Sequence, residues 1–255
     1  MKIFSFLILL HLLLIQTAKC QLVNIENLRM HTDSIRISGI FNFALAFNST
    51  NGKNIATIRG SGAVQYKSRN YKHLWLTAAN YNFAKAEGEN FVNAFYFHIR
   101  YNYKINSWLR WEAFTQSQTN EPLGIAYRQL LGTGPRFKII LAKHADIYLG
   151  TAYMYEYEKT VPPEKIVSRD SRSSNYISLN IRIPKINGSI ISTSYYQPLF
   201  RDLSDYRFMN DTRFTFSITN KWNIYTGFSY FYDSRPPTGI RKSALNLEQG
   251  FGISF

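Results

Sequence analysis

The last eight residues, Glu248-Gln249-Gly250-Phe251-Gly252-Ile253-Ser254-Phe255, decide the fold because the last six of them alternate between small or polar and apolar residues. Successive side chains of a strand point to opposite sides, so Phe251, Ile253 and Phe255 share one face. The sequence stops on an aromatic ring, which a soluble β-protein would rarely bury beside its carboxylate. A strand that closes a barrel instead ends at a membrane interface, where an aromatic ring is favourable.

The spacing within this stretch resembles the assembly signal of outer-membrane β-barrels. A polar residue, a glycine and two hydrophobic residues, the second of them terminal, stand at Glu248, Gly250, Ile253 and Phe255. The resemblance implies that the barrel-assembly machinery binds this strand. The alternative is the last strand of a soluble β-sandwich, in which a second sheet would have to cover the apolar rows.

Residues 1–20 have the features of a secretory signal peptide. Lys2 provides a positive start, residues 4–15 are apolar apart from one serine and one histidine, and small residues precede a cut near Cys20 and Gln21. The apolar run is too short for a comfortable transmembrane helix. We therefore expect export through the inner membrane.

Cys20 also raises the possibility of lipidation at the new N-terminus, although Lys19 directly before it fits a lipoprotein cleavage site poorly. A cut after Cys20 leaves a chain without cysteine, which needs no disulfide in an oxidising compartment.

Composition excludes two classes of protein. After the N-terminus no stretch approaches 18 unbroken apolar residues, which argues against helical membrane spans. Removal of the leader leaves 28 basic residues against 16 acidic ones, a net charge near +12. The basic residues are scattered singly along the chain without a nucleic-acid motif, so we expect no nucleic-acid partner.

The chain divides into a polar periplasmic lead-in, residues 21–33, and a region of period-two alternation, residues 34–255. A tilted membrane strand needs about 9–11 residues in the hydrocarbon core, whereas soluble strands average about five or six. Most of the alternating segments are long enough to cross. We expect twelve strands, at residues 34–48, 54–67, 72–84, 91–105, 108–118, 123–142, 147–158, 175–183, 189–199, 206–219, 223–233 and 241–255.

The connections alternate between generally long polar loops and short turns, which is typical of outer-membrane barrels. Residues 159–174 are the longest expected loop and residues 201–205 another, and a bulge or bend is expected at Gly132-Thr133-Gly134-Pro135. An even strand number places both termini on the periplasmic side. The sequence thus predicts an all-β protein, a single-domain antiparallel transmembrane β-barrel of twelve strands in the cell outer membrane.

The polar face of each strand would line the lumen, where charges must be paired or hydrated. A three-residue turn after residues 91–105 places Asn102 opposite Glu112 and Lys104 opposite Arg110. Two interpretations stay open: an ion-pair network that fills a narrow barrel, or a basic constriction that selects anionic solutes. The candidate residues are His98, Arg100, Asn102, Lys104, Arg110, Glu112, Gln116, Arg128 and Arg136, with Arg59, Arg182, Arg207 and Arg213 also expected on the inner face.

Three segments, Arg100-Tyr101-Asn102, residues 109–116 and residues 128–137, resemble the YdiY-like salt-induced outer membrane protein family of unknown function. The resemblance extends from about residue 23 to residue 255 and is densest between residues 90 and 140. It implies an outer-membrane β-barrel and brings no catalytic residue, cofactor or substrate.

Enzymatic chemistry has little support in the sequence. Barrel phospholipases need a histidine and a serine together on the outer wall, and no such motif surrounds His31, His73, His98 or His144. No His/Cys cluster has zinc spacing. Glu156 and Glu158 share a strand face, for which an outer-rim salt bridge or contact with lipopolysaccharide-bound cations is expected. We predict no catalytic residue, metal or cofactor.

The sequence therefore favours a monomeric outer-membrane barrel of structural or small-solute channel type with a polar, net-basic lumen. Its expected partners are outer-membrane lipid, lipopolysaccharide and the barrel-assembly machinery. The alternative function is a lipid-modifying or hydrolytic outer-membrane enzyme.

Overall fold

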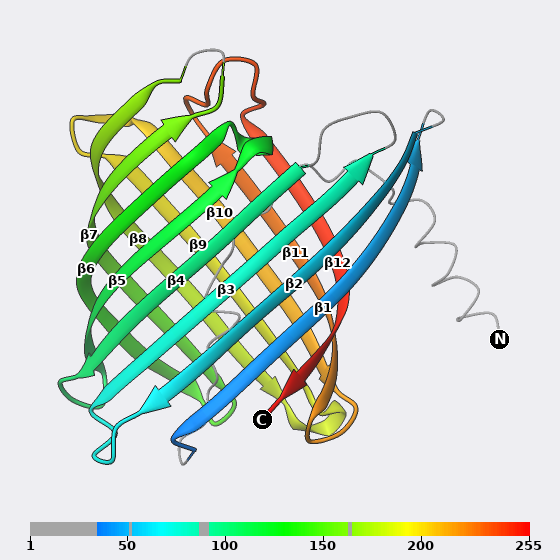
Figure 1. Cartoon of the computed structure of the whole chain (residues 1–255). Helices are drawn as coiled ribbons and strands as arrows, with labels where there is room; N and C mark the ends of the chain where they lie inside the picture. The colour runs from blue at the N-terminus through cyan, green and yellow to red at the C-terminus, as the bar shows by residue number, and fades with distance from the viewer. Residues whose placement is uncertain (1–34, 51–52, 87–91, 163–164) are drawn as a thin grey trace.

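A computed structural model describes residues 35–50, 53–86, 92–162 and 165–255 (Figure 1). The expected signal peptide and the whole lead-in segment lie outside the described residues. Within the described part of the chain, no helix has the length and apolarity needed to cross a lipid bilayer.

Twelve antiparallel strands form one closed barrel in which each strand pairs with its neighbours in sequence and β1 pairs with β12 (Figure 1). The predicted fold class is confirmed. The strands are β1 (Ile37–Thr50), β2 (Lys53–Lys67), β3 (His73–Ala86), β4 (Val92–Lys104), β5 (Leu109–Asn120), β6 (Ile125–Ala142), β7 (Ala145–Thr160), β8 (Val167–Ile183), β9 (Gly188–Leu199), β10 (Asp202–Ser217), β11 (Trp222–Asp233) and β12 (Ser243–Ser254), with 3-10 turns η2 (Glu121–Leu123) and η3 (Pro184–Ile186).

The C-terminal strand closes the barrel as predicted. Ile253 pairs with Phe41 across the β1–β12 seam. Beyond it, the Gly39 amide donates to the Phe255 carbonyl at 2.8 Å, and the Phe255 amide donates back at 3.0 Å. The Phe255 ring stacks on Phe41 with centroids 5.9 Å apart. The terminal aromatic therefore covers the seam on the outer face.

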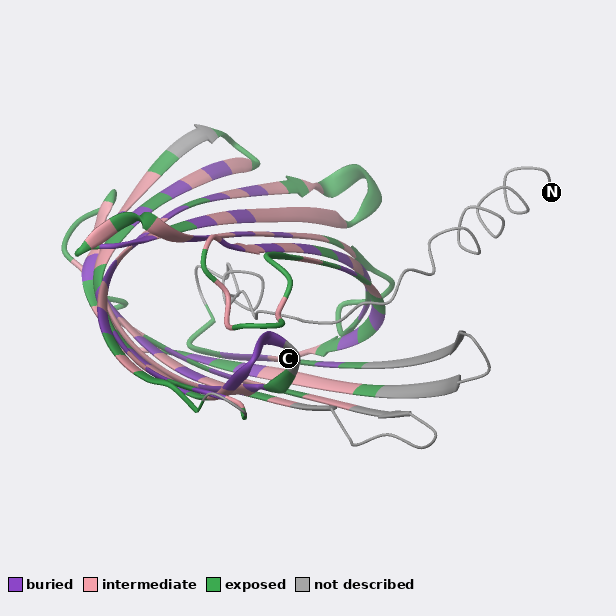
Figure 2. Ribbon diagram, turned by 90° about the horizontal axis from the view of Figure 1, so that it is seen from above, coloured by how far each residue is buried: buried purple, intermediate pink, exposed green. Residues whose placement is uncertain are grey.

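The inner and outer faces of the wall have reversed polarity relative to a soluble protein. Phe251 and Phe41 are 63% and 54% exposed on the outside, whereas Arg136 is 1% exposed on the inside. Figure 2 shows this alternation of buried and accessible residues along the strands. An apolar outer band with a polar interior is the pattern of a membrane-spanning barrel, since lipid replaces water around it.

β3 departs from this pattern. Leu76 and Ala78 are buried, whereas Trp75, on the opposite face, is exposed. The two inward residues pack with Ala63 and Tyr96 in a small apolar cluster. The inward row of β3 is therefore apolar at this point, unlike the polar inner face expected for the strands.

Two expected loops are wrong because the strands continue into them. β7 ends only at Thr160 and β8 begins at Val167, which places most of residues 159–174 in strands. β10 already begins at Asp202, within the expected loop at residues 201–205. Buried inward charges, among them Asp170 and Arg172, make these stretches look like polar loops in the sequence.

The bulge expected at residues 132–135 is also absent. Thr133 pairs with Tyr153 and Arg136 with Gly150 in the same register, so no extra residue is inserted between them, and the register shifts of β6 lie near its two ends. The glycine at 134 has another cause. A Cβ atom there would lie 2.0 Å from the Thr151 carbonyl oxygen, so the backbones of β6 and β7 approach too closely for a side chain.

This close approach predicts that Gly134→Ala destabilises the barrel by on the order of 1–3 kcal/mol, because the backbone of a neighbouring strand must shift. Gly60→Ala is the matched control, since nothing lies within 4 Å of its Cβ position. Urea unfolding in detergent micelles, followed by the gel shift between folded and boiled protein, measures both. Equal unfolding midpoints for the two variants would refute the packing argument.

Candidate functional site inside the barrel

The lumen has two ends. The terminal end is the one that holds Ile37 and Phe255, and the loop end, opposite to it, holds η2 and residues 234–242. Between them the inner wall carries several charge clusters, each built from strands that are distant in sequence.

The predicted pairing of β4 and β5 is confirmed. Asn102 lies opposite Glu112, and Lys104 lies opposite Arg110. His98, Arg100, Asn102 and Glu112 are all buried, whereas Lys104 and Arg110 are half-buried. The alternation in these two strands therefore assigned the lumen-facing residues correctly.

The Glu112 cluster consists of Arg100, Glu112, Arg136 and Tyr176. The Glu112 carboxylate lies 3.3 Å from Arg100 Nη1 and 3.4 Å from Arg136 Nη1. The Tyr176 hydroxyl donates to Glu112 Oε2 at 2.9 Å and accepts from Arg136 Nη1 at 3.1 Å. Two guanidinium groups thus share one carboxylate, and the cluster keeps a formal charge of +1.

Aromatic rings support the guanidinium groups of this cluster. Arg136 lies 4.1 Å from the centroid of the Tyr148 ring, and Arg100 lies 5.4 Å from that of Phe114. A cation over an aromatic face is favourable and is strengthened by desolvation. Sequence reasoning missed Tyr176 because its strand, β8, is three strands away from β5, and strand alternation relates only neighbours.

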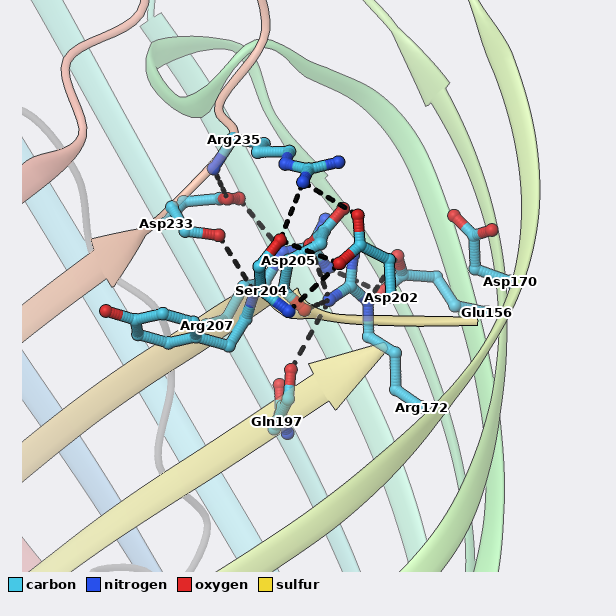
Figure 3. A network of polar contacts seen from close by, with 12 residues as sticks. Glu156, Asp170, Arg172, Gln197, Asp202, Ser204, Asp205, Arg207, Asp233 and Arg235 are labelled. Carbon is cyan, nitrogen blue, oxygen red and sulfur yellow. Dashed lines mark hydrogen bonds and ion pairs between the residues drawn. The ribbon is translucent and has the colours of Figure 1, made fainter. Parts of the chain in front are cut away.

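The Glu156 cluster lies nearer the loop end (Figure 3). Arg207 Nη1 lies 2.6 Å from Glu156, its Nη2 lies 3.1 Å from Glu158, and its Nε lies 3.0 Å from Asp233. The other two arginines complete the cluster: Arg128 Nε donates to Glu158 at 2.7 Å, Arg172 Nε lies 3.5 Å from Glu156, and Arg172 Nη1 lies 3.0 Å from Asp205.

This second cluster corrects an expectation. Glu156 and Glu158 lie on the inner face of β7 and are buried, so the expected outer-rim location is wrong. Their neighbours Tyr155 and Tyr157 take the outer face instead. The cluster holds three guanidinium groups against four carboxylates and is not a basic constriction.

The Glu248 cluster is built from side chains of β2, β10 and β12. Glu248 lies 3.3 Å from Arg59 Nη1 and 3.5 Å from Arg213 Nη2. Arg213 stacks over Tyr225 at 4.0 Å from the ring centroid. Again two guanidinium groups flank one carboxylate. Glu248, predicted as part of the assembly signal, thus also pairs charges inside the lumen.

Arg182, also predicted inside, lies at the rim of the terminal end. Its side chain is 45% exposed, and its Nη2 lies 3.9 Å from Asp146, which Lys138 approaches to 3.5 Å.

A cavity of about 50 Å³ lies in the lumen between the Glu112 and Glu156 clusters. On one side the Tyr96, His98 and Phe114 rings stack in a row. Gln116 accepts from the Tyr96 hydroxyl at 3.2 Å and contacts His98 Nδ1 at 3.2 Å. A cavity of this size and polarity has room for a few water molecules, so this part of the lumen is narrow.

The loop end is crossed by residues 234–242. A Cβ atom at Gly124, just after η2, would lie 3.1–3.2 Å from side-chain atoms of Pro237 and Ile240. β11–β12 and β5–β6 stand on opposite sides of the closed strand order, so this contact spans the mouth. Figure 2 shows the loop reaching across the opening. Arg235 anchors it to the wall through Asp202 at 2.7 Å.

Of the three described histidines, two have side chains used in packing and hydrogen bonding. His73 Nδ1 contacts the Tyr101 hydroxyl at 2.7 Å, His98 belongs to the aromatic row, and His144 is exposed in a turn. Among the residues that the structure describes, no group of three or more His, Cys, Asp or Glu side chains is arranged to hold a metal ion.

Comparison with known proteins supports the fold. The family described as "Protein of unknown function, DUF481" matches residues 41–255. No curated protein matches the chain.

Several solved membrane barrels are similar in structure. The NanC porin is 12% identical, with coverage of 86% of this chain and 98% of its own and a TM-score of 0.51. The translocator domain of the autotransporter NalP from Neisseria meningitidis is 8% identical, with coverage of 86% and 87% and a TM-score of 0.50. The chain is thus a closed antiparallel barrel like those of outer-membrane porins and autotransporters.

The Glu156 cluster predicts a large effect of Glu156→Gln. The change removes one buried ion-pair partner from both Arg207 and Arg172, which keep Glu158, Asp233 and Asp205 as partners, and costs on the order of 2–3 kcal/mol of unfolding free energy. Asp202→Asn is the control, because the Asp202–Arg235 pair is well exposed and its loss should barely move the midpoint. Urea unfolding in micelles compares the two. Matching midpoints would show that the buried cluster does not stabilise the barrel.

Proposed function

The chain belongs to the DUF481 family of proteins of unknown function, and we propose that it is a narrow outer-membrane channel for small solutes, with a preference for anions. The proposal rests on the inner wall of the barrel, because the family itself assigns no substrate.

The location has three supports. The outer band of the wall is apolar, residues 1–20 have the pattern of a signal peptide, and the C-terminal strand has the pattern that the assembly machinery recognises. The resemblance to YdiY-like salt-induced outer membrane proteins points the same way. We further propose cleavage near Cys20 and Gln21, insertion through the barrel-assembly machinery and a monomeric state.

The distribution of charge on the inner wall carries the preference for anions. In both the Glu112 and the Glu248 clusters, two arginines flank a single glutamate, which leaves each cluster with a formal charge of +1. Positive charge fixed in a narrow, poorly screened lumen attracts anions and repels cations.

Passage is slow in this proposal because the loop end is obstructed. The Glu156 cluster fills part of the lumen, and the loop of residues 234–242 lies across the mouth. A solute must pass beside both, so a small conductance is expected.

The same obstruction favours a second candidate, a structural barrel that conducts nothing. An enzyme is the third, for which the notable feature is His73 on the wall beside Tyr101. We propose that the protein is not an enzyme. Phospholipid or lipopolysaccharide turnover by purified protein, lost on substitution of a histidine, would reverse this view.

The anion preference predicts a defined shift in the reversal potential of single channels in a planar bilayer under a KCl gradient. The wild type should favour chloride. The Arg59→Gln/Arg213→Gln variant should favour potassium, because the formal charge of the Glu248 cluster changes from +1 to −1.

Lys221→Gln is the control, since Lys221 lies in an exposed turn at the terminal end and should not change selectivity. Chloride preference that persists in the double variant would refute the assigned selectivity. Silence of all three proteins in every salt would favour the structural barrel.

A further inference from the structure

Two basic side chains stand apart from the rest. Of the basic side chains that the structure describes within the strands, those of Lys159 in β7 and Arg169 in β8 lie on the outward-facing rows and are exposed. The remaining strand-borne bases lie on the inward rows. A charge on the outer wall of a membrane barrel is costly at the middle of the bilayer and tolerated near its surface.

The two bases are neighbours. Arg169 pairs with Tyr157 and Lys159 with Val167, which places Lys159 and Arg169 diagonally on one face of the β7–β8 ladder. The Arg169 guanidinium lies 5.8 Å from the centroid of the Tyr157 ring. Lys165, in the connecting loop, is also exposed. We refer to Lys159, Lys165 and Arg169 as the β7–β8 basic patch.

The described carboxylates of these two strands do not neutralise the patch. Glu156, Glu158 and Asp170 lie on the alternate, inward rows of β7 and β8 and are buried. Glu156 and Glu158 pair with lumenal arginines, and Asp170 pairs with Arg201 at 2.8 Å. The alternation of the strands therefore places these acids and the bases Lys159 and Arg169 on opposite faces of the wall.

The depth of the patch matches the headgroup region. Further along the outer face, away from the loop end, lie the exposed rings of Tyr155 and Tyr153 and the side chain of Leu131. Tyr127 packs against Tyr157 with centroids 6.3 Å apart. Tyrosines followed by bases mark the boundary between the hydrocarbon core and the polar surface of a bilayer.

We propose that the β7–β8 basic patch binds the phosphate groups of lipid A in the leaflet at the loop end. Arginine presents a planar fork of donors that matches a phosphate, and lysine adds a point charge beside it. The acyl chains would lie along the tyrosines and leucine below. This inference rests on the proposed outer-membrane location with the loop end outward, but not on conduction.

Native mass spectrometry of the full chain, folded in detergent and titrated with diphosphorylated lipid A, tests the site. Lys159→Gln/Arg169→Gln should weaken binding about tenfold or more. Lys143→Gln/Lys221→Gln, which removes two exposed bases from turns at the terminal end, should bind like the wild type. Heat-modifiable migration on a gel confirms that each variant is folded.

The chemistry of the contact is tested with dephosphorylated lipid A, for which the patch variant and the wild type should bind equally. The proposal is overturned if the patch variant keeps wild-type affinity for the phosphorylated lipid, or if the control variant loses as much. It is also overturned if phosphatidylglycerol shows the same tenfold difference, since the site would then bind phospholipid phosphate in general. A silent channel would sink the proposed function and leave these outcomes unchanged.

Discussion

The constraint on which the rest of the structure depends is that a charge on the inner wall of a narrow barrel must find an opposite charge nearby. An unpaired buried charge costs several kcal/mol, whereas a paired and hydrogen-bonded one is tolerated. Arg207 shows how this is met: it contacts Glu156, Glu158 and Asp233, which come from strands on both sides of β10. Such contacts tie β6, β7, β8, β10 and β11 together through the lumen as well as around the wall.

The inner and outer faces of the wall have different roles. Inside, the clusters set the local charge. The Glu112 and Glu248 clusters each have two guanidinium groups and one carboxylate, whereas the Glu156 cluster has three guanidinium groups and four carboxylates. At the loop end the contact between residues 234–242 and Gly124 narrows the mouth. Outside, aromatic and aliphatic side chains form an apolar band, and we propose that the β7–β8 basic patch lies at the level of the lipid headgroups. The proposed function uses the first two features, and the lipid proposal uses the third.

The sequence alone predicted the features that follow from the two-residue alternation of a strand. Twelve strands, the closing role of Phe255, and the pairing of Asn102 with Glu112 all follow from alternation and turn length. Contacts across the lumen cannot be predicted in this way, because they depend on which non-neighbouring strands the curvature of the barrel wall brings together. Tyr176 contacts Glu112 from three strands away, and no local sequence pattern predicts this contact.

Two of the misread segments share one physical cause, which is that the inner wall of a barrel contains charged residues and glycines, which are typical of loops in other proteins. Charges on β7 and β8 suggested a loop at residues 159–174, although they are the inward rows of two strands. Gly134 suggested a bulge, although it allows close approach of two backbones. β3 reversed the usual polarity because Leu76 and Ala78 pack against Tyr96 inside the lumen.

Locking the loop of residues 234–242 provides the sharpest test of the proposed channel, whose mouth at the loop end this loop obstructs. The position of a Cβ at Gly124 lies 3.2 Å from Pro237 Cβ, so a small outward movement of the loop reaches the roughly 3.5–4.5 Å separation of a disulfide, and the one cysteine of the sequence lies in the predicted signal peptide. Single-channel recordings of Gly124→Cys/Pro237→Cys should show no conductance when oxidised and wild-type conductance after reduction, with each single variant insensitive to reductant. Equal conductance of the oxidised and reduced forms would contradict the account.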